Sequence, residues 1–445
     1  MNRRNFLNLS VSALPLITKL PELSLVFVSN KTVSKFQVSV NRRYLIDEKG
    51  DPFFIIGDTP WFIQRLTIDN VRLVLNDRQK KGYNSLLLEI LDDSKIPSVD
   101  GNGNNAFETD TDITRPNEAY WKYTEQILEE ADNRGFFISI NPIWYGWGPG
   151  LWMHHINPTN IAVYGEFLGK RFARFRNIMW LNAGDRNPDD RLDVCTRVFI
   201  EKIKRFAPHH LHTVHNAHEY SSSDFYIQED WLDINSGYTY GKSYLHILPE
   251  YYRSHPVKPI ILCETGYEAE PNDIYSLQDP NSGPLWTPYL IRRNVWWAVF
   301  SGACGYFAGS RLWRWEPNWK ETLNVRSTIE APLVHQLLKT MAWWKLVPDT
   351  HHELVTEGYG EFDDVNYVTA AFTPEGDCAV VYLPESEKIT LNTTIFKEEP
   401  EANWFDPTDG SRKPATGTNL AYGKVEYQSP GKNSTGEPDW VLVVK

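Results

Sequence analysis

The sequence predicts an α/β protein with a (β/α)8 TIM barrel over residues 31–348, followed by a small all-β sandwich domain over residues 349–445. Strand-like apolar runs alternate with helix-like segments eight times, which favours a closed ring of parallel strands joined by helices. Near residue 347 the helical pattern stops, and short strand-like runs follow, separated by Gly, Pro, Asp and Asn. An open dinucleotide-binding sheet is disfavoured, because no G-x-G-x-x-G follows the first strand.

Each element of the barrel is expected from its own residue pattern. Strands are predicted at 53–57, 83–90, 136–143, 178–181, 211–215, 232–238, 259–263 and 304–308. Helices are predicted at 67–81, 117–133, 161–175, 190–206, 244–254, 288–301 and 331–346. A hairpin over 36–40 and 44–46 is expected to cap the barrel, and the sandwich strands are expected at 367–372, 378–383, 389–391, 402–405 and 440–444.

The composition argues against two classes of binding partner, nucleic acids and membranes. The net charge is −12 with no basic stripe, so neither nucleic acid nor an anionic membrane surface is expected. No apolar stretch is long enough to span a bilayer, and no membrane insertion is expected. The chain has 17 Trp and 22 Tyr, whose polar groups need partners, so we expect some of these rings to meet a ligand and others to pack in the core. Cys195, Cys263 and Cys304 lie in apolar runs and are predicted to be buried thiols.

Residues 1–30 have the pattern of an export leader. Arg3 and Arg4 are followed by an apolar run that reaches Leu16, which resembles a twin-arginine signal and predicts a periplasmic or extracellular protein. Lys19 and Glu22 interrupt the apolar region, so a basic tail on a cytoplasmic protein is the alternative.

Two apolar runs, 177–185 and 259–264, each end on one carboxylate, Asp185 and Glu264. The carboxyl ends of barrel strands form the active-site face, so both acids are expected at one mouth. Two carboxylates in a cleft rich in aromatic residues suggest hydrolysis of glycosidic bonds, with Asp185 protonating the leaving oxygen and Glu264 acting as nucleophile or base. Placement on the fourth and seventh strands favours retention of configuration.

Each acid also has a structural interpretation. Asp185 stands in Asp-Arg-Asn-Pro, which suits a turn or a helix N-cap. Glu264 could form an ion pair with Arg292 or Arg311.

Other residues that follow the predicted strands are candidates for sugar binding, since aromatic rings stack on sugar faces and polar groups bind hydroxyls. Packing is an equally open interpretation for each aromatic ring. The candidate substrate-binding residues are Asp58, Trp61, Asn141, Trp144, Trp147, His215, His218, Tyr238, Tyr267 and Trp315.

A metal-dependent hydrolase is a further alternative, because His210, His212, His215 and His218 lie in one segment. However, the first strand carries no H-x-H and the chain contains no H-E-x-x-H, so no metal is expected. No serine-nucleophile elbow or P-loop is present either, and no cofactor is expected.

Several motifs together resemble the apiosidase-like glycoside hydrolases, glycoside hydrolase family 140. They are Tyr44-Leu-Ile-Asp47, Pro52-Phe-Phe-Ile-Ile-Gly-Asp58-Thr-Pro-Trp61, Tyr164-Gly165, Leu168-Gly169, Arg171, the runs around both acids, Val381-Tyr-Leu-Pro384, Trp404-Phe-Asp-Pro-Thr-Asp-Gly410 and Asp439-Trp-Val-Leu-Val443. The last three resemble the family's C-terminal β-domain, sometimes described as collagen-binding. The resemblance covers about residue 36 to the C-terminus.

The resemblance implies a barrel in which Asp185 is the acid/base and Glu264 the second carboxylate. Known activity in the family includes removal of apiose-linked chains from a pectic polysaccharide. The chain departs from the family pattern at Ala183, in a usual Gly-Gly-Asp, at Tyr238, where the family has His, and at Ala308 and Gly309, in place of Tyr-Gly. These positions lie where substrate is expected, so the activity class carries over better than the sugar. A polysaccharide or oligosaccharide substrate is expected, and a non-catalytic carbohydrate- or matrix-binding protein with a degenerate barrel is the alternative.

Overall fold

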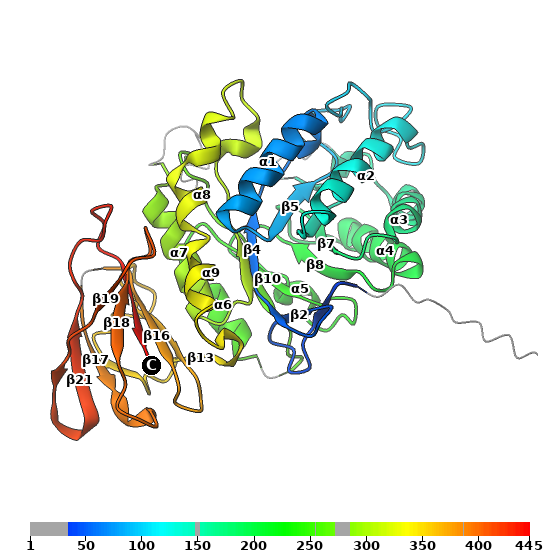
Figure 1. Cartoon of the computed structure of the whole chain (residues 1–445). Helices are drawn as coiled ribbons and strands as arrows, with labels where there is room; N and C mark the ends of the chain where they lie inside the picture. The colour runs from blue at the N-terminus through cyan, green and yellow to red at the C-terminus, as the bar shows by residue number, and fades with distance from the viewer. Residues whose placement is uncertain (1–33, 147–151, 254, 272–284, 386) are drawn as a thin grey trace, which may run out of the picture. The chain divides into compact units, whose positions relative to one another are not determined.

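The computed structural model describes residues 34–146, 152–253, 255–271, 285–385 and 387–445. In these residues a nine-stranded sheet runs in the order β8-β7-β6-β5-β4-β12-β11-β10-β9 (Figure 1). Its parallel strands are β4 (Ile55–Asp58), β5 (Ser85–Glu89), β6 (Phe137–Asn141), β7 (Ile178–Ala183), β8 (Leu211–His215), β10 (Asn235–Tyr238), β11 (Ile260–Glu264) and β12 (Gly305–Phe307). The short strand β9 (Tyr220–Ser221) pairs antiparallel with β10. The predicted TIM barrel is confirmed.

Strands β8 and β10 close the ring without a regular ladder. The backbone N–H groups of Asp233 and Ile234 donate to the carbonyl of His212, at 3.0 and 3.3 Å. The hydroxyl of Ser236 donates to the carbonyl of Val214 at 2.5 Å. These bonds satisfy polar groups that an open sheet edge would leave unpaired.

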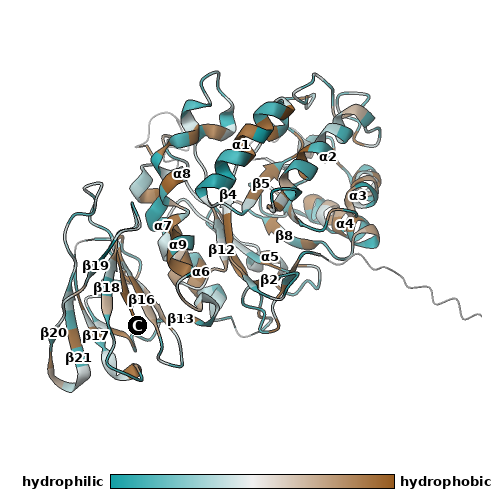
Figure 2. Ribbon diagram, viewed as in Figure 1, coloured by the Kyte–Doolittle hydropathy of each residue, from teal (hydrophilic) through white to brown (hydrophobic). Residues whose placement is uncertain are grey.

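Side chains alternate between the barrel interior and the helical layer. Ile55, Leu87, Phe137 and Met179 belong to one buried cluster, whereas their neighbours on the same strands, such as Ile56, belong to a second cluster that includes helical residues. Strands such as β4, β7 and β11 therefore carry apolar residues on both sides, which explains the continuous apolar runs in the sequence; Figure 2 shows hydrophobic colour on strands of the barrel. A filled interior leaves the ends of the barrel as the places for a ligand.

The helices follow the prediction closely up to residue 300. The α-helices of the described residues are α1 (Ile68–Lys81), α2 (Glu118–Asp132), α3 (Pro158–Phe172), α4 (Asp190–Phe206), α5 (Ser223–Tyr226), α6 (Tyr244–Tyr251), α7 (Pro288–Phe300), α8 (Arg326–Glu330) and α9 (Leu333–Leu338). Gly82 caps α1 in the left-handed conformation, with φ of 95°. In the described residues no helix is long and apolar enough to cross a membrane.

The single helix predicted over 331–346 is wrong. The chain forms α9 and then a separate 3-10 turn, Trp343–Lys345, after Ala342 leaves the helical conformation. Trp343 packs against Phe54 and Tyr44, with ring centroids 5.0 and 5.7 Å apart. These tertiary contacts decide the local conformation over the helical propensity of the segment.

The N-terminal hairpin is a three-stranded sheet of β1 (Phe36–Val38), β2 (Leu45–Asp47) and β3 (Pro52–Phe53). The ring of Phe36 lies 4.8 Å from that of Phe137, the first residue of β6. The sheet therefore covers the N-terminal end of the barrel, as predicted, and leaves the carboxyl ends of the strands accessible. Residues 1–33, which include the predicted leader, lie outside the described residues.

The C-terminal region is all β. One sheet contains β13 (Val347–Pro348), β15 (Thr369–Phe372), β16 (Ala379–Leu383), β22 (Trp440–Val444), β18 (Ala402–Phe405) and β19 (Arg412–Pro414). The other contains β14 (Val355–Glu357), β17 (Lys388–Asn392), β21 (Lys424–Gln428) and β20 (Thr418–Asn419). Val381 and Leu442 from the first sheet share a buried core with Ile389 and Leu391 from the second, so the two sheets form the predicted sandwich.

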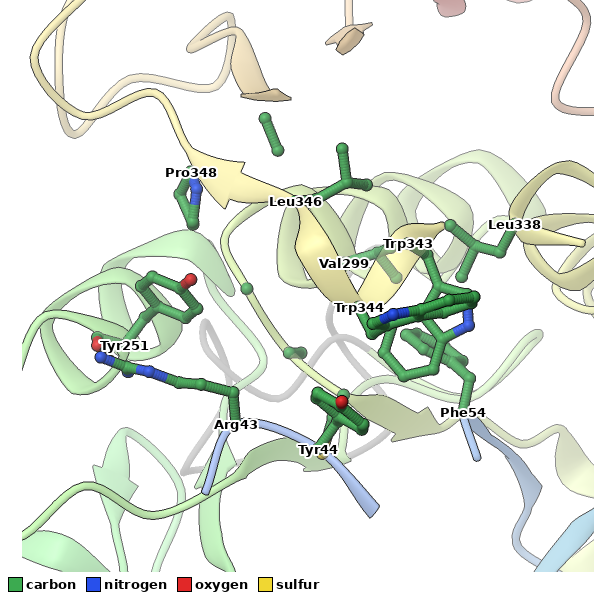
Figure 3. A pocket seen from close by; sticks show the side chains of 14 residues that line it. Arg43, Tyr44, Phe54, Tyr251, Val299, Leu338, Trp343, Trp344, Leu346 and Pro348 are labelled. Atoms are coloured by element: carbon green, nitrogen blue, oxygen red, sulfur yellow. Dashed lines mark hydrogen bonds between the residues drawn. The ribbon is translucent and has the colours of Figure 1, made fainter. Parts of the chain in front are cut away.

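A small hollow lies at the N-terminal side of the barrel, between Arg43, Tyr44, Tyr251 and Trp343 (Figure 3). Its volume of about 30 Å³ has room for about one water molecule. A sugar ring does not fit there, so this hollow is not a candidate substrate site.

Candidate active site

Asp185 reaches the barrel mouth through an unusual turn after β7. Ala183, Gly184 and Asp185 all have positive φ, of 62°, 148° and 45°. A β-carbon on Gly184 would lie 2.3 Å from the Trp144 ring, so glycine is required there by the close contact as well as by φ. The turn directs Asp185 toward the strand ends instead of making it a helix cap; the N-cap of α4 is Asp189.

Glu264 is the last residue of β11 and is 6% exposed. The hydroxyl of Tyr267 donates to its Oε1 at 2.5 Å, and the Nε2 of His215 lies 2.7 Å from its Oε2. The ion pair considered with Arg292 or Arg311 does not form, because Arg292 binds Asp439, Glu330 and Glu437 and Arg311 binds Glu316 and Glu270.

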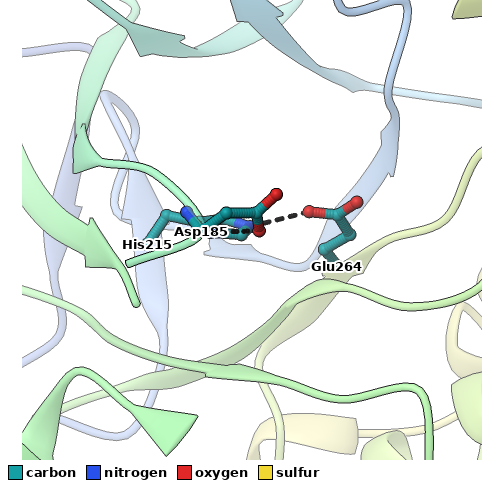
Figure 4. A group of neighbouring side chains, drawn as sticks. All are labelled: Asp185, His215 and Glu264. Carbon is teal, nitrogen blue, oxygen red and sulfur yellow. Dashed lines mark hydrogen bonds and ion pairs between the residues drawn. The ribbon is translucent and has the colours of Figure 1, made fainter. Parts of the chain in front are cut away.

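His215, the last residue of β8, faces both acids (Figure 4). Its Nδ1 is 3.8 Å from Asp185 Oδ1 and 3.1 Å from the carbonyl oxygen of Asn216. Facing atoms of Asp185, His215 and Glu264 all lie within 4.8 Å of one another. The second oxygen of Glu264 is therefore hydrogen-bonded to His215 and the first to Tyr267.

The three groups have different electrostatic environments. Burial and the negative charge of Glu264 raise the pKa of Asp185 to about 7, although His215 partly opposes this. Burial disfavours a charged His215, but its hydrogen bond to Glu264 and the charges of both acids outweigh burial and raise the pKa of His215. Near neutral pH, Asp185 is therefore partly protonated, whereas Glu264 accepts hydrogen bonds at both oxygens. When the environments of two nearby carboxyl groups push their pKa values apart, the group with the raised pKa commonly acts as the acid and the other as the nucleophile.

The acids open into a cleft of about 500 Å³ at the carboxyl ends of the strands. The volume suits a small saccharide. The residues that line it are Trp61, Phe62, Glu89, Asp93, Trp144, Asp185, Tyr240, Glu264, Tyr267, Glu270, Pro271, Trp286, Trp313 and Arg314.

Three of the predicted substrate-binding residues line this cleft: Trp61, Trp144 and Tyr267. The indole N–H of Trp61 donates to the Tyr267 hydroxyl at 2.7 Å. Because that hydroxyl donates to Glu264, the three residues are connected by two consecutive hydrogen bonds. His215 and Tyr238 lie behind the cleft wall, with ring centroids 4.5 Å apart. They are placed to position the acids.

The other predicted substrate-binding residues that the structure describes do not line the cleft. Asp58 is buried against Arg78, with Oδ2 and Nε 2.6 Å apart. Asn141 donates to the carbonyls of Leu181 and Ala183, at 2.9 and 2.6 Å, and so braces the end of β7.

Two more candidates contact other aromatic rings. The rings of His218 and Tyr240 lie 5.9 Å apart, and those of Trp315 and Trp319 lie 5.4 Å apart. Trp147 lies outside the described residues.

The histidines considered as a metal cluster do not converge. His210 is bound to Trp180 and to the carbonyl of Phe175, at 3.0 and 2.7 Å. On β8, His212 places its Nδ1 3.4 Å from the Nδ2 of Asn182 on β7, and among these four histidines His215 is the one within ion-pair distance of Asp185 and Glu264. Asp185, His215 and Glu264 are the described residues that could together offer three ligand atoms to a metal, but His215 and Glu264 direct their facing atoms at each other.

Sequence reasoning missed the acidic side of the cleft formed by Glu89 and Asp93. Glu89 ends β5 after Ser-Leu-Leu-Leu, so it has the same strand-end signal as Glu264. Trp286, which packs over Gly266, was also missed. Its segment has no regular strand or helix pattern that would have placed it.

Comparisons with known proteins identify the family of the chain. The sequence model described as "Apiosidase-like, catalytic domain" matches residues 39–345. The chain belongs to the apiosidase-like glycoside hydrolase family. Residues 347–445 match a second model, described as "Putative collagen-binding domain of a collagenase". No protein with a curated description matches the chain.

Solved structures of glycoside hydrolases share the fold of this apiosidase-like protein. One described as a glycoside hydrolase has a TM-score of 0.80 and 24% identity, over 92% of this chain and 96% of that one. Another, described as a glycoside hydrolase family 5 protein from Bacteroides vulgatus ATCC 8482, has a TM-score of 0.78 and 25% identity, over 92% and 93% of the two chains.

The position of Asp58 gives a stability prediction. Replacing Asp58 by Asn leaves the buried Arg78 without its main counter-charge and should lower the free energy of unfolding by about 3–5 kcal/mol, measured by chemical denaturation. The matched control is Asp69→Asn, which removes an exposed ion pair with Arg72 from the same helix region and should cost less than about 1 kcal/mol. A loss of sugar affinity in Asp58→Asn without a loss of stability would contradict the structural role.

Proposed function

We propose that this protein is a retaining glycoside hydrolase in which Asp185 is the acid/base and Glu264 the nucleophile. The single observation that carries the proposal is the placement of the two acids within 4.8 Å of each other at a cleft of sugar size. Retaining enzymes hold their carboxyl groups about 5–5.5 Å apart, whereas inverting enzymes need about 6.5–9.5 Å to admit a water molecule.

The proposed reaction has two steps. Asp185 donates its proton to the glycosidic oxygen while Glu264 attacks the anomeric carbon, so the glycosidic bond breaks and a glycosyl ester forms on Glu264. Asp185, now ionised, takes a proton from a water molecule, which attacks the same carbon and releases the sugar and the free Glu264 carboxylate. The proton returned to Asp185 completes the cycle.

The neighbours of Glu264 assist both steps. His215 and Tyr267 bind one oxygen each and fix the orientation of the carboxylate. A protonated His215 also offsets the charge that Asp185 acquires after the first step, because its Nδ1 faces Asp185 Oδ1 at 3.8 Å. Trp61 and Trp144 supply aromatic faces beside the acids, with ring centroids 5.0 Å apart.

Polysaccharide or oligosaccharide chains are the proposed substrates, and the family description makes apiose-bearing oligosaccharides the first to test. We further propose, from residues 1–30 alone, that the protein is exported. A full-length chain found in the periplasm or medium, and retained in the cytoplasm when Arg3 and Arg4 are both replaced by Lys, would support the twin-arginine route; unchanged export would contradict it.

Substituting each acid tests its role. Asp185→Asn should lower kcat/KM about 10²- to 10⁴-fold, and least for substrates with good leaving groups, which need no proton. Glu264→Ala should abolish turnover, and added azide should restore it with a glycosyl azide of inverted configuration as product. The measurement is hydrolysis of aryl glycosides and pectic oligosaccharides, with the azide product identified by NMR.

Two neighbouring residues provide matched controls. Asp189→Asn keeps a good N-cap for α4 and should retain activity. Glu268 accepts a hydrogen bond from the backbone N–H of Ser327 and does not line the cleft, so Glu268→Gln should also retain activity. Substantial turnover by both Asp185→Asn and Glu264→Ala would contradict the proposed mechanism. Sugar binding by a wild-type protein that hydrolyses none of the panel would favour the non-catalytic alternative.

The pKa of Asp185 predicts the alkaline side of the pH profile. The raised pKa, about 7, keeps Asp185 protonated at lower pH, and the protonated form is the one that donates. kcat/KM for a substrate with a poor leaving group should therefore fall about tenfold for each pH unit above about 7. A profile that stays flat to pH 9 would contradict the assignment of Asp185 as the acid.

A further inference from the structure

Glu89 faces the active-site cleft from a strand that carries neither acid. It is the last residue of β5 and lines the cleft together with Asp93. Its backbone N–H donates to the carbonyl of Trp61 at 2.9 Å, which fixes the residue at the barrel mouth. Strands β5 and β7 both pair with β6, so their carboxyl ends bring Glu89 to the same mouth as Asp185.

Glu89 is also buried with an unsatisfied polar atom. The residue is 2% exposed, and its Oε1 has no hydrogen-bond partner among the residues that the structure describes. An unpaired buried polar atom costs about 1–3 kcal/mol, so such atoms normally have a partner. Because Glu89 lines the cleft, a ligand in the cleft can supply that partner.

No positive charge is free to pair with Glu89 among the described residues around it. Arg65 donates to both oxygens of Asp92, each at 2.6 Å. Burial and the charges of Asp93 and Asp92 raise the pKa of Glu89 well above its usual range. A carboxyl oxygen can accept a hydrogen bond from a hydroxyl group, and a protonated carboxyl group can also donate one.

The charges of the cleft also limit the kind of sugar. The one cation among the described lining residues is Arg314, whose Nε and Nη2 bind Glu270 at 2.6 and 2.5 Å. An anionic sugar near Glu89 would therefore meet Asp93 without a compensating cation. The buried indole N–H of Trp286, also unpaired among the described residues, adds a neutral donor to the cleft wall.

We propose that Glu89 is a specificity-determining residue that binds a hydroxyl group of a neutral sugar held between Asp185 and Glu264, without taking part in bond cleavage. The proposal rests on the function proposed above, because it places the hydroxyl on the sugar that reacts. It distinguishes the two carboxyl groups that react, Asp185 and Glu264, from one that recognises the substrate, Glu89.

The test compares Glu89→Gln with Glu89→Ala. Glutamine can still donate and accept, so Glu89→Gln should keep kcat/KM within about fivefold of wild type, whereas Glu89→Ala should lose about 30- to 100-fold. The probes are 4-nitrophenyl glycosides of neutral pentoses and hexoses, the monodeoxy analogues of the best substrate, and a 4-nitrophenyl glucuronide. The glucuronide should not be hydrolysed.

The deoxy analogues give a readout that a purely structural role would not change. For one of these analogues, kcat/KM of the wild type should be at least about 30-fold lower than for the parent substrate. The same comparison in Glu89→Ala should give less than about a threefold difference, because the hydrogen bond is already absent. Equal sensitivity of both proteins to every deoxy analogue would overturn the proposal. So would a Glu89→Gln variant as inactive as Asp185→Asn, since that would make Glu89 a reacting group.

The two proposals fail differently. If the wild type hydrolyses nothing, the proposed function fails, and binding of the same glycosides is then measured by quenching of cleft tryptophan fluorescence. Weaker binding of one neutral glycoside by Glu89→Ala, but not by Glu89→Gln, would still support the role of Glu89; unchanged binding would overturn it. Glu250→Gln, a buried glutamate outside the cleft, is the matched control.

Discussion

The site depends on one electrostatic constraint: the carboxyl groups of Asp185, which is partly exposed, and Glu264, which is buried, lie within 4.8 Å and cannot both carry a full charge at low cost. His215 relieves this constraint, because it comes from a strand between those that carry the acids and its ring faces both of them. Burial then keeps a proton on Asp185, while two donors hold Glu264. The ends of the fourth, fifth and seventh barrel strands thus bring together Asp185, His215 and Glu264, three groups in different electrostatic environments.

The sequence predicted the barrel and both acids because their signal is local. A strand buried on both faces must be apolar throughout, so a carboxylate at its end stands out, as Asp185 and Glu264 do. Glu89 had the same signal in a similar run and was overlooked. The edge strands β19 and β20 could not be found, because their exposed polar residues show no apolar alternation.

The direction of a side chain at a strand end is harder to predict than its position. Asp58 and Asp185 both follow apolar strands, yet Asp58 pairs with Arg78 of α1, while the turn at residues 183–185 brings Asp185 to the cleft. Only the partner or the backbone conformation distinguishes the two cases, and neither is visible in spacing. Likewise, residues 331–346 have helical propensity, but contacts of Trp343 with the barrel break the helix.

The left-handed turn at Ala183, Gly184 and Asp185 has a consequence for how this site can diverge. Left-handed conformations cost non-glycine residues of the order of 1–3 kcal/mol, and they persist only where the surroundings fix them. Here the ring of Trp144 packs directly on the turn that carries Asp185 and leaves no room for a side chain at residue 184. We therefore expect sugar specificity to change through the residues of the cleft wall, such as Trp286 and Trp313, which lie on segments that follow other strands. The turn at residues 183–185 should stay the same.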